Sequence, residues 1–467
     1  MKNALWILIA LAAVSCSTPG EPPSGSAAGE VRLITLDPGH FHASLVQKIM
    51  VPNVSPLVHV YAPDGPELQD HLNRISGFNS RPQDPTRWRE EVYKGPDFLE
   101  RMIRDKKGNV VVISGNNRDK ARYIKAAVDA GLNVLADKPM CIDPAGFELV
   151  KSAFATAGTN GVLLYDIMTE RSEITSVLQR ELIALPAVFG TLSAGTPEEP
   201  AVVMASVHHF FKSVAGIPLV RPAWFFDVAQ QGEGLVDVAV HLVDLVSWEC
   251  FPDRKIEDPS EIEIVGAERW MTPLTRDEFR ILTNLEDFPD SLAKDVRDGK
   301  LQVYSNGRVD YRLRGVHVRV TVTWNFQPPE GGGDAHLSIV RGTKAHLVIL
   351  QEKEQNFRPE LYVQAAPGAV PEDLAASLVQ AMTFLKKKYP GLELAEEKGR
   401  WHILIPDAYR IGHEAHFGQV MERFLGFLQD GRLPEWEVSN MIAKYDLTTR
   451  ALALAKTGRR DTDRPPK

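Results

Sequence analysis

The chain contains only three cysteines among 467 residues, too few for a fold held together by disulfide bonds. Basic residues are also scarce relative to acidic ones, with 53 Lys and Arg against 61 Asp and Glu and a formal net charge of -8. No domain-wide basic surface is expected, which argues against nucleic acid as a partner. The composition, 44% hydrophobic and 24% charged, is that of a globular protein, and the length predicts at least two domains.

The N-terminus carries the pattern of an export signal. An apolar run over residues 4–14 is too short to span a bilayer as a helix, and residues 13–16, Ala-Val-Ser-Cys, resemble a bacterial lipobox. We expect residues 1–15 to be a lipoprotein signal peptide and Cys16 to be lipidated; an ordinary cleaved signal is the alternative. Residues 16–30 are rich in Ser, Pro, Gly and Ala, which predicts a flexible tether. The folded part is therefore expected in the bacterial cell envelope, anchored through its lipid and facing the periplasm or the surface.

Residues 31–161 alternate short apolar runs with amphipathic stretches. The expected strands are 31–36, 57–61, 110–113 and 133–136, and the expected helices are 43–50 and 119–130. Nearly continuous apolar strands separated by helices indicate a parallel sheet covered on both faces. This block is predicted to be a doubly wound α/β domain, whose ligands bind at the carboxyl ends of the strands.

Residues 162–456 have a different pattern, dominated by β-rich segments. The expected strand segments are 188–194, 206–212, 261–270, 301–326 with a turn at Asn306-Gly307, and 336–351 with a turn at Arg341-Gly342. The expected helices are 234–250, 372–387, 413–430 and 437–455. Tight turns join antiparallel strands, so we predict an α+β domain with an open, mainly antiparallel sheet. Residues 457–467 form a charged tail that is expected to be disordered.

Asp137-Lys138-Pro139 directly follows the last predicted strand of the first block. A lysine at this edge of the sheet would face the ligand crevice, where its ammonium can polarise a substrate oxygen or lower the pKa of a hydroxyl group. A lysine on the surface with no such role is the alternative.

A second candidate is the apolar segment 234–250, which contains three ionisable residues. Asp237, His241 and Asp244 are spaced at i, i+4 and i+7, so one helix would place them along a single stripe. Ionisable groups on a buried helix must be paired or functional. A carboxylate one turn from an imidazole is typical of an oriented general base, although a purely structural histidine remains the alternative.

Histidines gather in two further segments. His40 and His42 stand in the first predicted turn, and His208 and His209 in a predicted strand. No Cys or carboxylate stands beside them at a recognisable ligand spacing, so no metal site is expected and a polar lining of the crevice is favoured. Phe41 and the aromatic run 224–226 could form an apolar wall for a sugar, or plain core.

With Asp137-Lys138-Pro139-Met140 and the pattern Asp237-x-x-x-His241-x-x-Asp244 both present, the chain resembles the glucose-fructose oxidoreductase and inositol dehydrogenase (Gfo/Idh/MocA) family. Residues 413–455 resemble the oxidoreductase C-terminal domain of its envelope lipoprotein branch. The resemblance implies a Rossmann-like N-terminal domain and hydride transfer between a sugar or polyol hydroxyl and NAD or NADP. It further implies that His241 takes the hydroxyl proton, Lys138 stabilises the oxyanion, and Asp237 orients the imidazole.

Further site residues follow from the same resemblance. Those expected to bind the cofactor are Gly39, His40, Phe41, Asp64, Asn117 and Asp137, and those expected to bind substrate are His209, Trp224 and Asp244. The first turn departs from the family pattern G-x-G-x-x-G/A, because Asp37-Pro38-Gly39-His40-Phe41-His42 keeps only the middle glycine. We therefore expect the dinucleotide to bind in an altered pose or not at all.

The sequence thus predicts an envelope-anchored oxidoreductase that acts on carbohydrate, forms a homo-oligomer and holds its cofactor tightly, because free nicotinamide cofactors are not supplied outside the cytoplasm. Two alternatives stay open: an NAD-dependent glycosidase or lyase without net redox change, and a cofactor-free carbohydrate-binding protein that kept the fold. Cys141 and Cys250 could form one disulfide or remain two buried thiols.

Overall fold

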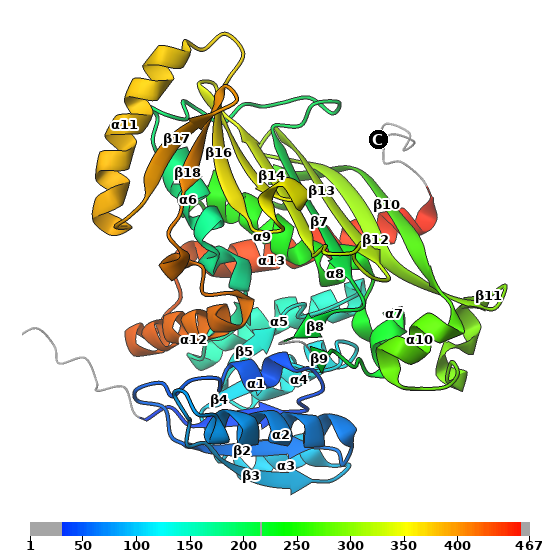
Figure 1. Cartoon of the computed structure of the whole chain (residues 1–467). Helices are drawn as coiled ribbons and strands as arrows, with labels where there is room; N and C mark the ends of the chain where they lie inside the picture. Colours follow the sequence, from blue (N-terminus) through cyan, green and yellow to red (C-terminus); the bar gives the residue numbers. More distant parts are fainter. Residues whose placement is uncertain (1–29, 215–216, 459–467) are drawn as a thin grey trace, which may run out of the picture.

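The computed structural model describes residues 30–214 and 217–458 (Figure 1). The predicted signal peptide, Cys16 and almost all of the tether, together with residues 459–467 of the predicted tail, lie outside the described residues. Within those two ranges, no helix is both long and apolar enough to cross a membrane.

The first domain is built on a parallel six-stranded sheet with the order β3-β2-β1-β4-β5-β6. Its strands are β1 (Leu33–Leu36), β2 (Leu57–Ala62), β3 (Arg89–Lys94), β4 (Val110–Ile113), β5 (Asn133–Asp137) and β6 (Leu164–Ile167). Its helices are α1 (His42–Leu45), α2 (Pro66–Ser80), α3 (Phe98–Asp105), α4 (Lys120–Asp129) and α5 (Pro144–Asn160). Every residue of β1 and β4 is buried, as expected for strands covered on both faces. The predicted doubly wound domain is confirmed, and its sheet continues beyond residue 161 through β6.

The second domain is built on a ten-stranded sheet with the order β10-β12-β13-β7-β14-β15-β16-β18-β17, in which β11 pairs with β12. Its strands are β7 (Val202–His209), β10 (Ile262–Leu274), β11 (Val296–Arg297), β12 (Lys300–Leu313), β13 (Val316–Asn325), β14 (Ala335–Arg341), β15 (Ala345–Gln351), β16 (Glu360–Ala365), β17 (Glu393–Glu397) and β18 (Arg400–Leu404). Only the β13–β7 ladder of this sheet is parallel. The predicted open, mainly antiparallel sheet is confirmed.

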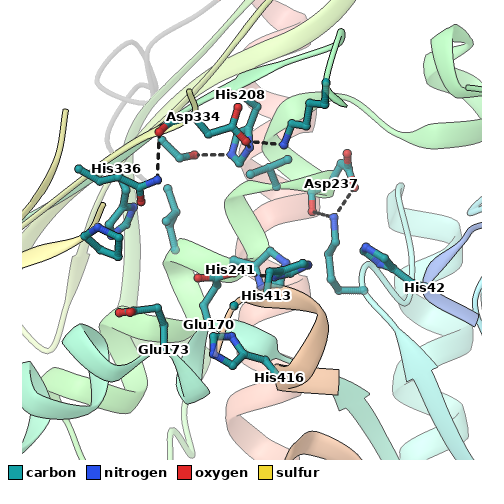
Figure 2. A pocket seen from close by; sticks show the side chains of 18 of the residues that line it. His42, Glu170, Glu173, His208, Asp237, His241, Asp334, His336, His413 and His416 are labelled. Carbon is teal, nitrogen blue, oxygen red and sulfur yellow. Dashed lines mark hydrogen bonds and ion pairs between the residues drawn. The ribbon is translucent and has the colours of Figure 1, made fainter. Parts of the chain in front are cut away.

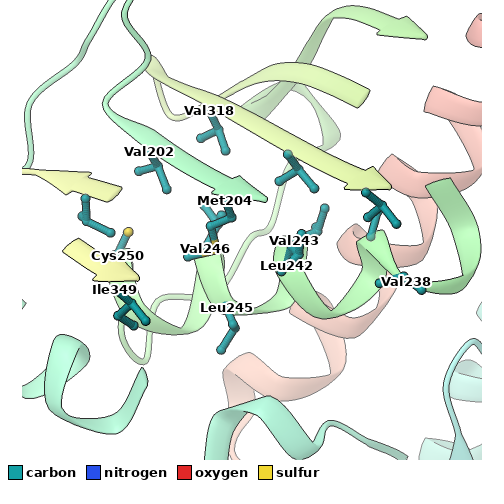
Figure 3. Close-up of a cluster of buried hydrophobic side chains, with 14 of the residues drawn as sticks. Val202, Met204, Val238, Leu242, Val243, Leu245, Val246, Cys250, Val318 and Ile349 are labelled. Atoms are coloured by element: carbon teal, nitrogen blue, oxygen red, sulfur yellow. The ribbon is translucent and has the colours of Figure 1, made fainter. Parts of the chain in front are cut away.

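Helices lie between this sheet and the first domain (Figure 1). The helices of the second part of the chain are α6 (Ile174–Ile183), α7 (Val228–Gln231), α8 (Gly234–Asp237), α9 (Ala239–Cys250), α10 (Arg276–Thr283), α11 (Pro371–Lys388), α12 (His413–Asp430) and α13 (Glu435–Thr457). Val243 and Val246 of α9 pack in one apolar cluster with Val202, Met204 and Val318 of the sheet (Figure 3).

The C-terminal helices α12 and α13 complete the core of the first domain. Phe417 and Phe424 of α12, and Met441 and Tyr445 of α13, belong to the same apolar cluster as the parallel strands. Helix α13 also contacts α5, α9 and β10. The last part of the chain therefore joins the two domains.

One turn and one strand predicted within the second domain are wrong. Asn306-Gly307 is no turn, because β12 runs through it and turns at Arg314-Gly315 instead. Gly307 serves close packing: a Cβ there would lie 2.5 Å from Leu235 Cγ. The segment 188–194 is not a strand, because the N–H groups of Val188 and Phe189 bond back to the Leu185 carbonyl.

Both cysteines in the described residues are buried free thiols. Cys141 packs in the core of the first domain and Cys250 in that of the second. The alternative of two buried thiols is therefore the one that the structure shows.

Candidate active site

A cavity of about 740 Å³ lies where the two domains meet. Its floor is the carboxyl edge of the first sheet, since Gly115, Asn117 and Lys138 follow β4 and β5. Its other walls come from the second sheet, from α9 and from the segment that precedes α12. The carboxyl edge is where open α/β sheets bind ligands, so this cavity is the candidate active site.

Lys138 and Asp237 form an ion pair across the domain boundary. The Lys138 ammonium lies 2.8 Å from Asp237 Oδ1 and 3.1 Å from the Asp237 backbone carbonyl oxygen. Gln231 donates to the other carboxylate oxygen at 3.0 Å. Burial opposes ionisation of Asp237, but the neighbouring Lys138 charge outweighs it and lowers the pKa of the carboxyl group. The pair is therefore ionised and holds the lysine head group in place.

A break in the predicted helix 234–250 creates this arrangement. The segment forms two helices, α8 and α9, separated at Val238. The backbone N–H of His241 bonds to the Val238 carbonyl at 3.0 Å and not to that of Asp237, as a regular α-helix would require. The Asp237 carbonyl is thereby available to accept from Lys138.

His241 lies in the cavity beside a group of ionisable side chains from distant segments. Figure 2 shows it with Glu170, His413 and His416. Its Nδ1 atom is buried and has no hydrogen-bond partner among the described residues. Burial, reinforced by the positive charge of Lys138, lowers the pKa of His241 to about 3. The imidazole is thus neutral at neutral pH and can accept a proton. No hydrogen bond joins the His241 ring to Asp237 within the described chain. Asp237 therefore positions Lys138 and, contrary to the expectation, does not orient His241.

Glu170 supplies the negative charge of this group. Its carboxylate lies 3.5 Å from His413 Nδ1. Burial opposes its ionisation, but the hydrogen bond with His413 and the other nearby imidazoles bring the pKa of Glu170 below its usual range. An ionised carboxylate beside several imidazoles can stabilise the positive charge that His241 gains when it takes up a proton.

Asp334 organises the opposite wall of the cavity. It pairs with Lys212 and lies 3.5 Å from His208 Nδ1 and 3.0 Å from His209 Nδ1. His208 also stacks on Trp324, with 5.0 Å between the ring centroids. An aromatic face beside charged hydrogen-bonding groups suits a polar ligand with apolar C–H faces, such as a sugar.

The turn after β1 brings His40 and His42 to the floor of the cavity beside Asp137. His42 Nδ1 lies 3.0 Å from Asp137 Oδ2, to which Ser114 also donates. Asp37 opens the turn with a φ of 47°, a left-handed conformation that aspartate tolerates better than most residues. This explains how the turn forms without the first glycine of the family pattern.

Of the four other residues expected to bind the cofactor, two line this cavity and two do not. Phe41 and Asn117 line it. Gly39 packs beside Trp224, and a Cβ on it would lie 3.6 Å from the Trp224 ring. Asp64 lies beyond β2, largely exposed, and pairs with Lys94 at 3.1 Å.

Three expected substrate residues do not line the cavity. His209 is buried behind its wall, and Trp224 lies against the first turn. Asp244 is engaged elsewhere: its carboxylate accepts from Arg171 at 2.6 and 2.7 Å and from Lys444 at 2.8 Å. Since both oxygen atoms of Asp244 bind buried cations, its expected contact with substrate is replaced by a structural role.

Several cavity residues were missed from the sequence. They are Glu170, His336, Asp334 and His413. None stands in a recognisable motif, and they are separated by long stretches of chain. The cluster of His413 and His416 at the start of a predicted helix was the only local signal that the C-terminal segment returns to the site.

Two family models match the chain. Residues 39–165 match the model described as "Oxidoreductase family, NAD-binding Rossmann fold" and residues 178–456 match "Putative oxidoreductase C terminal domain". Among curated proteins, no match was found.

Solved structures agree with the family models. A "putative oxidoreductase" from Parabacteroides merdae ATCC 43184 is 52% identical, with a TM-score of 0.90, over 93% of this chain and 99% of its own. Levoglucosan dehydrogenase in complex with NADH and L-sorbose shares 15% identity and a TM-score of 0.59, over 91% of this chain and 97% of its own. A "putative oxidoreductase" from Thermotoga maritima shares 13% identity and a TM-score of 0.58, over 92% of this chain and 99% of its own. The latter two likenesses show the fold alone.

The two family models together match most of the chain, and the Parabacteroides merdae relative matches it over nearly its whole length. The chain belongs to the Gfo/Idh/MocA family of NAD(P)-dependent oxidoreductases, in the group that carries the oxidoreductase C-terminal domain.

Proposed function

We propose that the protein oxidises a hydroxyl group of a sugar or polyol in the bacterial cell envelope, with NAD or NADP held tightly during the cycle. The observation that carries this proposal is the cavity in which Lys138 is fixed by Asp237 and a neutral His241 is available as a base. Alcohol oxidation requires both functions, since the hydroxyl loses a proton while its carbon loses a hydride.

The residues on the cavity floor fit the nicotinamide end of the cofactor. Gly115, Asn117 and Lys138 stand at the carboxyl edge of the parallel strands, where doubly wound domains bind nucleotides. The first turn offers few free amide donors, because Gly39 N–H bonds to Asp37 and His40 N–H to Ser114. We therefore assign no residue of this turn to the pyrophosphate. When bound, the cofactor accepts the hydride.

The chain's own groups then have distinct roles. His241 takes the hydroxyl proton, and the Lys138 ammonium stabilises the negative charge that develops on the substrate oxygen. Asp237 holds that ammonium through two hydrogen bonds. Glu170 balances the imidazolium that forms on His241.

A carbohydrate is supported by the polar cavity wall and by fold neighbours. Trp324 and His208 form a stacked pair next to Asp334 and Lys212, and sugars bind where aromatic faces alternate with hydrogen-bonding groups. Levoglucosan dehydrogenase, a fold neighbour, has been crystallised with L-sorbose.

The test has two steps. The purified protein is denatured and its supernatant searched by mass spectrometry for a dinucleotide; the native protein is then assayed with a panel of sugars for reduction of bound or added NAD(P). His241→Gln is expected to lower turnover at least a hundredfold, whereas His346→Gln, outside the cavity, should retain it. Turnover by His241→Gln at the rate of the His346→Gln control would refute the proposal. Sugar cleavage without net reduction would favour the redox-neutral glycosidase or lyase.

The envelope location is part of the proposal and rests on the lipobox-like segment 13–16. Metabolic labelling with a fatty-acid analogue should mark the wild-type protein and not a Cys16→Ser variant. Unlabelled wild-type protein recovered from the cytoplasmic fraction would overturn this assignment.

We also propose that the chain forms a homo-oligomer through the open face of its second sheet. Strand β10 at its edge exposes Trp270 and Met271, which are 37% and 45% exposed, and such apolar groups on an open sheet favour association. Sedimentation velocity should show an oligomer for the wild type and a shift toward monomer for Trp270→Lys. A monomeric wild type would contradict the proposed oligomer.

A further inference from the structure

Two imidazoles and a carboxylate meet on the floor of the cavity, next to the Lys138 and Asp237 pair. Asp137 Oδ2 lies 3.0 Å from His42 Nδ1 and 4.0 Å from His40 Nδ1. Ligand atoms of the three residues all lie within 4.8 Å of one another. We propose that His40, His42 and Asp137 form a binding site for a divalent transition metal ion of the zinc type.

The distances fit a shared ion. Zinc binds nitrogen and oxygen at about 2.0–2.2 Å, so two ligand atoms of one tetrahedral ion are about 3–4 Å apart. The two separations from Asp137, 3.0 and 4.0 Å, fall in this range, and an ion at His40 Nδ1 would replace the hydrogen bond that this nitrogen accepts from the His42 N–H at 3.3 Å. The donor set also selects the ion, because magnesium and calcium prefer oxygen ligands, whereas two imidazoles and one carboxylate suit zinc, iron or cobalt.

The site is supported by its surroundings. Ser114 donates to Asp137 Oδ2 at 2.9 Å, and Lys120 bonds to the Asp137 backbone carbonyl at 3.1 Å. The His42 ring packs against Phe417, with 4.6 Å between centroids. Partners of this kind fix the orientation of metal ligands. The ammonium groups of Lys120 and Lys138 lie close by and reduce the affinity for a cation, so binding should be weaker than at a closed four-ligand zinc site.

The open coordination positions face the candidate active site. His40, His42 and Asp137 line the same cavity as Lys138 and His241. Three protein ligands with a free position are typical of zinc sites that bind water or substrate, in contrast to closed structural sites. The ion would therefore take an oxygen ligand from the cavity, either water or a hydroxyl group of the bound molecule.

The site arises because the first turn departs from the glycine pattern of the family. In the family pattern G-x-G-x-x-G/A, the position of His42 carries glycine or alanine, which offers no ligand atom. Here the His42 side chain fills the space between the turn and the end of β5, where it reaches Asp137. The same substitution that alters the dinucleotide turn thus supplies the second imidazole.

Cobalt and zinc titrations test the proposal. Protein without a polyhistidine tag is treated with a chelator, dialysed and titrated with Co²⁺, whose visible absorption reports nitrogen and oxygen coordination, and separately with Zn²⁺ in a calorimeter. We expect one ion per chain and displacement of Co²⁺ by Zn²⁺. Asp137→Asn and His40→Gln should each weaken binding at least tenfold.

The matched control is His208→Gln, which removes a different imidazole of the same cavity and should bind as the wild type does. Circular dichroism establishes folding of each variant. Because the His40 side chain is 19% exposed, against 5% for Asp137, His40→Gln should fold even if Asp137→Asn does not. The proposal is overturned if the wild type binds no ion at one per chain, or if His208→Gln weakens binding as much as His40→Gln.

Discussion

The ammonium group of Lys138 binds both the carboxylate and the backbone carbonyl of Asp237, a residue 99 positions further along the chain. The first domain contributes the lysine and the second contributes the acid, so this ammonium group is fixed only when the domains are docked. Both side chains are largely buried, with 13% and 8% of their surface exposed. Such a pair is much less screened by solvent than a surface ion pair.

Replacing Lys138 with Met should lower kcat by a factor of about 100 or more and change KM little, because the ammonium acts on charge that develops in the transition state. Steady-state kinetics with a sugar that is active in the panel assay measure both constants. Lys212→Met is the control: this lysine lines the same cavity but pairs with Asp334, so its loss should act mainly on KM. An effect of Lys138→Met confined to KM would contradict the oxyanion role.

His241 should remain unprotonated throughout the range from pH 8 to pH 5. Its pKa is lowered to about 3 by burial and by Lys138, so the folded protein binds no proton there until the solution is strongly acidic. NMR spectra of protein labelled at histidine nitrogens, assigned by comparison with His241→Gln, should show no titration of this ring above pH 5. A midpoint near 6.5 would show that the imidazole is solvated and unperturbed.

Acid should destabilise the fold partly through His71, a buried residue of α2 with no hydrogen-bond partner at either ring nitrogen among the described residues. Burial lowers its pKa from 6.5 to about 4. As pH falls below 6.5 the unfolded chain takes up a proton that the folded chain does not, so the free energy of unfolding decreases. The loss reaches about 3 kcal/mol near pH 4.

Urea denaturation at pH 7 and pH 4.5 measures this effect. The drop in unfolding free energy between the two pH values should be smaller in His71→Leu than in the wild type. Equal drops in the two proteins would exclude His71 as a source of acid sensitivity.

Asp244→Asn should destabilise the protein by about 3–5 kcal/mol, because it leaves two buried cations, Arg171 and Lys444, short of a negative charge. Chemical denaturation measures this change in the free energy of unfolding. The variant must show intact secondary structure at zero denaturant. The exposed pair of Arg450 and Asp446 provides the control: Asp446→Asn should cost under about 1 kcal/mol. A small effect of Asp244→Asn would show that the network is dispensable for stability.

The sequence was most informative where the apolar pattern is regular. Strand β4 at Val110–Ile113 and helix α12 at His413–Asp430 have the predicted bounds, since uninterrupted valines and an amphipathic repeat leave few alternatives. The motifs around Lys138 and His241 also placed both residues at one cavity, because the carboxyl edge of a parallel sheet is fixed by topology.

The predictions that failed concern residues whose roles are determined by contacts with distant parts of the chain. Asp244 follows His241 at helical spacing, yet Arg171 and Lys444, 73 and 200 residues away, determine its role. Asn306 and Gly307 form a common turn dipeptide, but Asn306 donates to the Trp270 carbonyl and accepts from Trp324 N–H inside a continuous sheet. The partner of His42 is Asp137, 95 residues further on, so no local spacing indicated the cluster.

The last two helices have a consequence for how the chain folds during synthesis. Because α12 and α13 insert Phe417, Phe424, Met441 and Tyr445 into the core of the first domain, that core stays incomplete until the ribosome has made nearly the whole polypeptide. The nascent first domain must expose apolar surface for most of this time. A chain that folds late in this way stays accessible to chaperones until its C-terminus emerges.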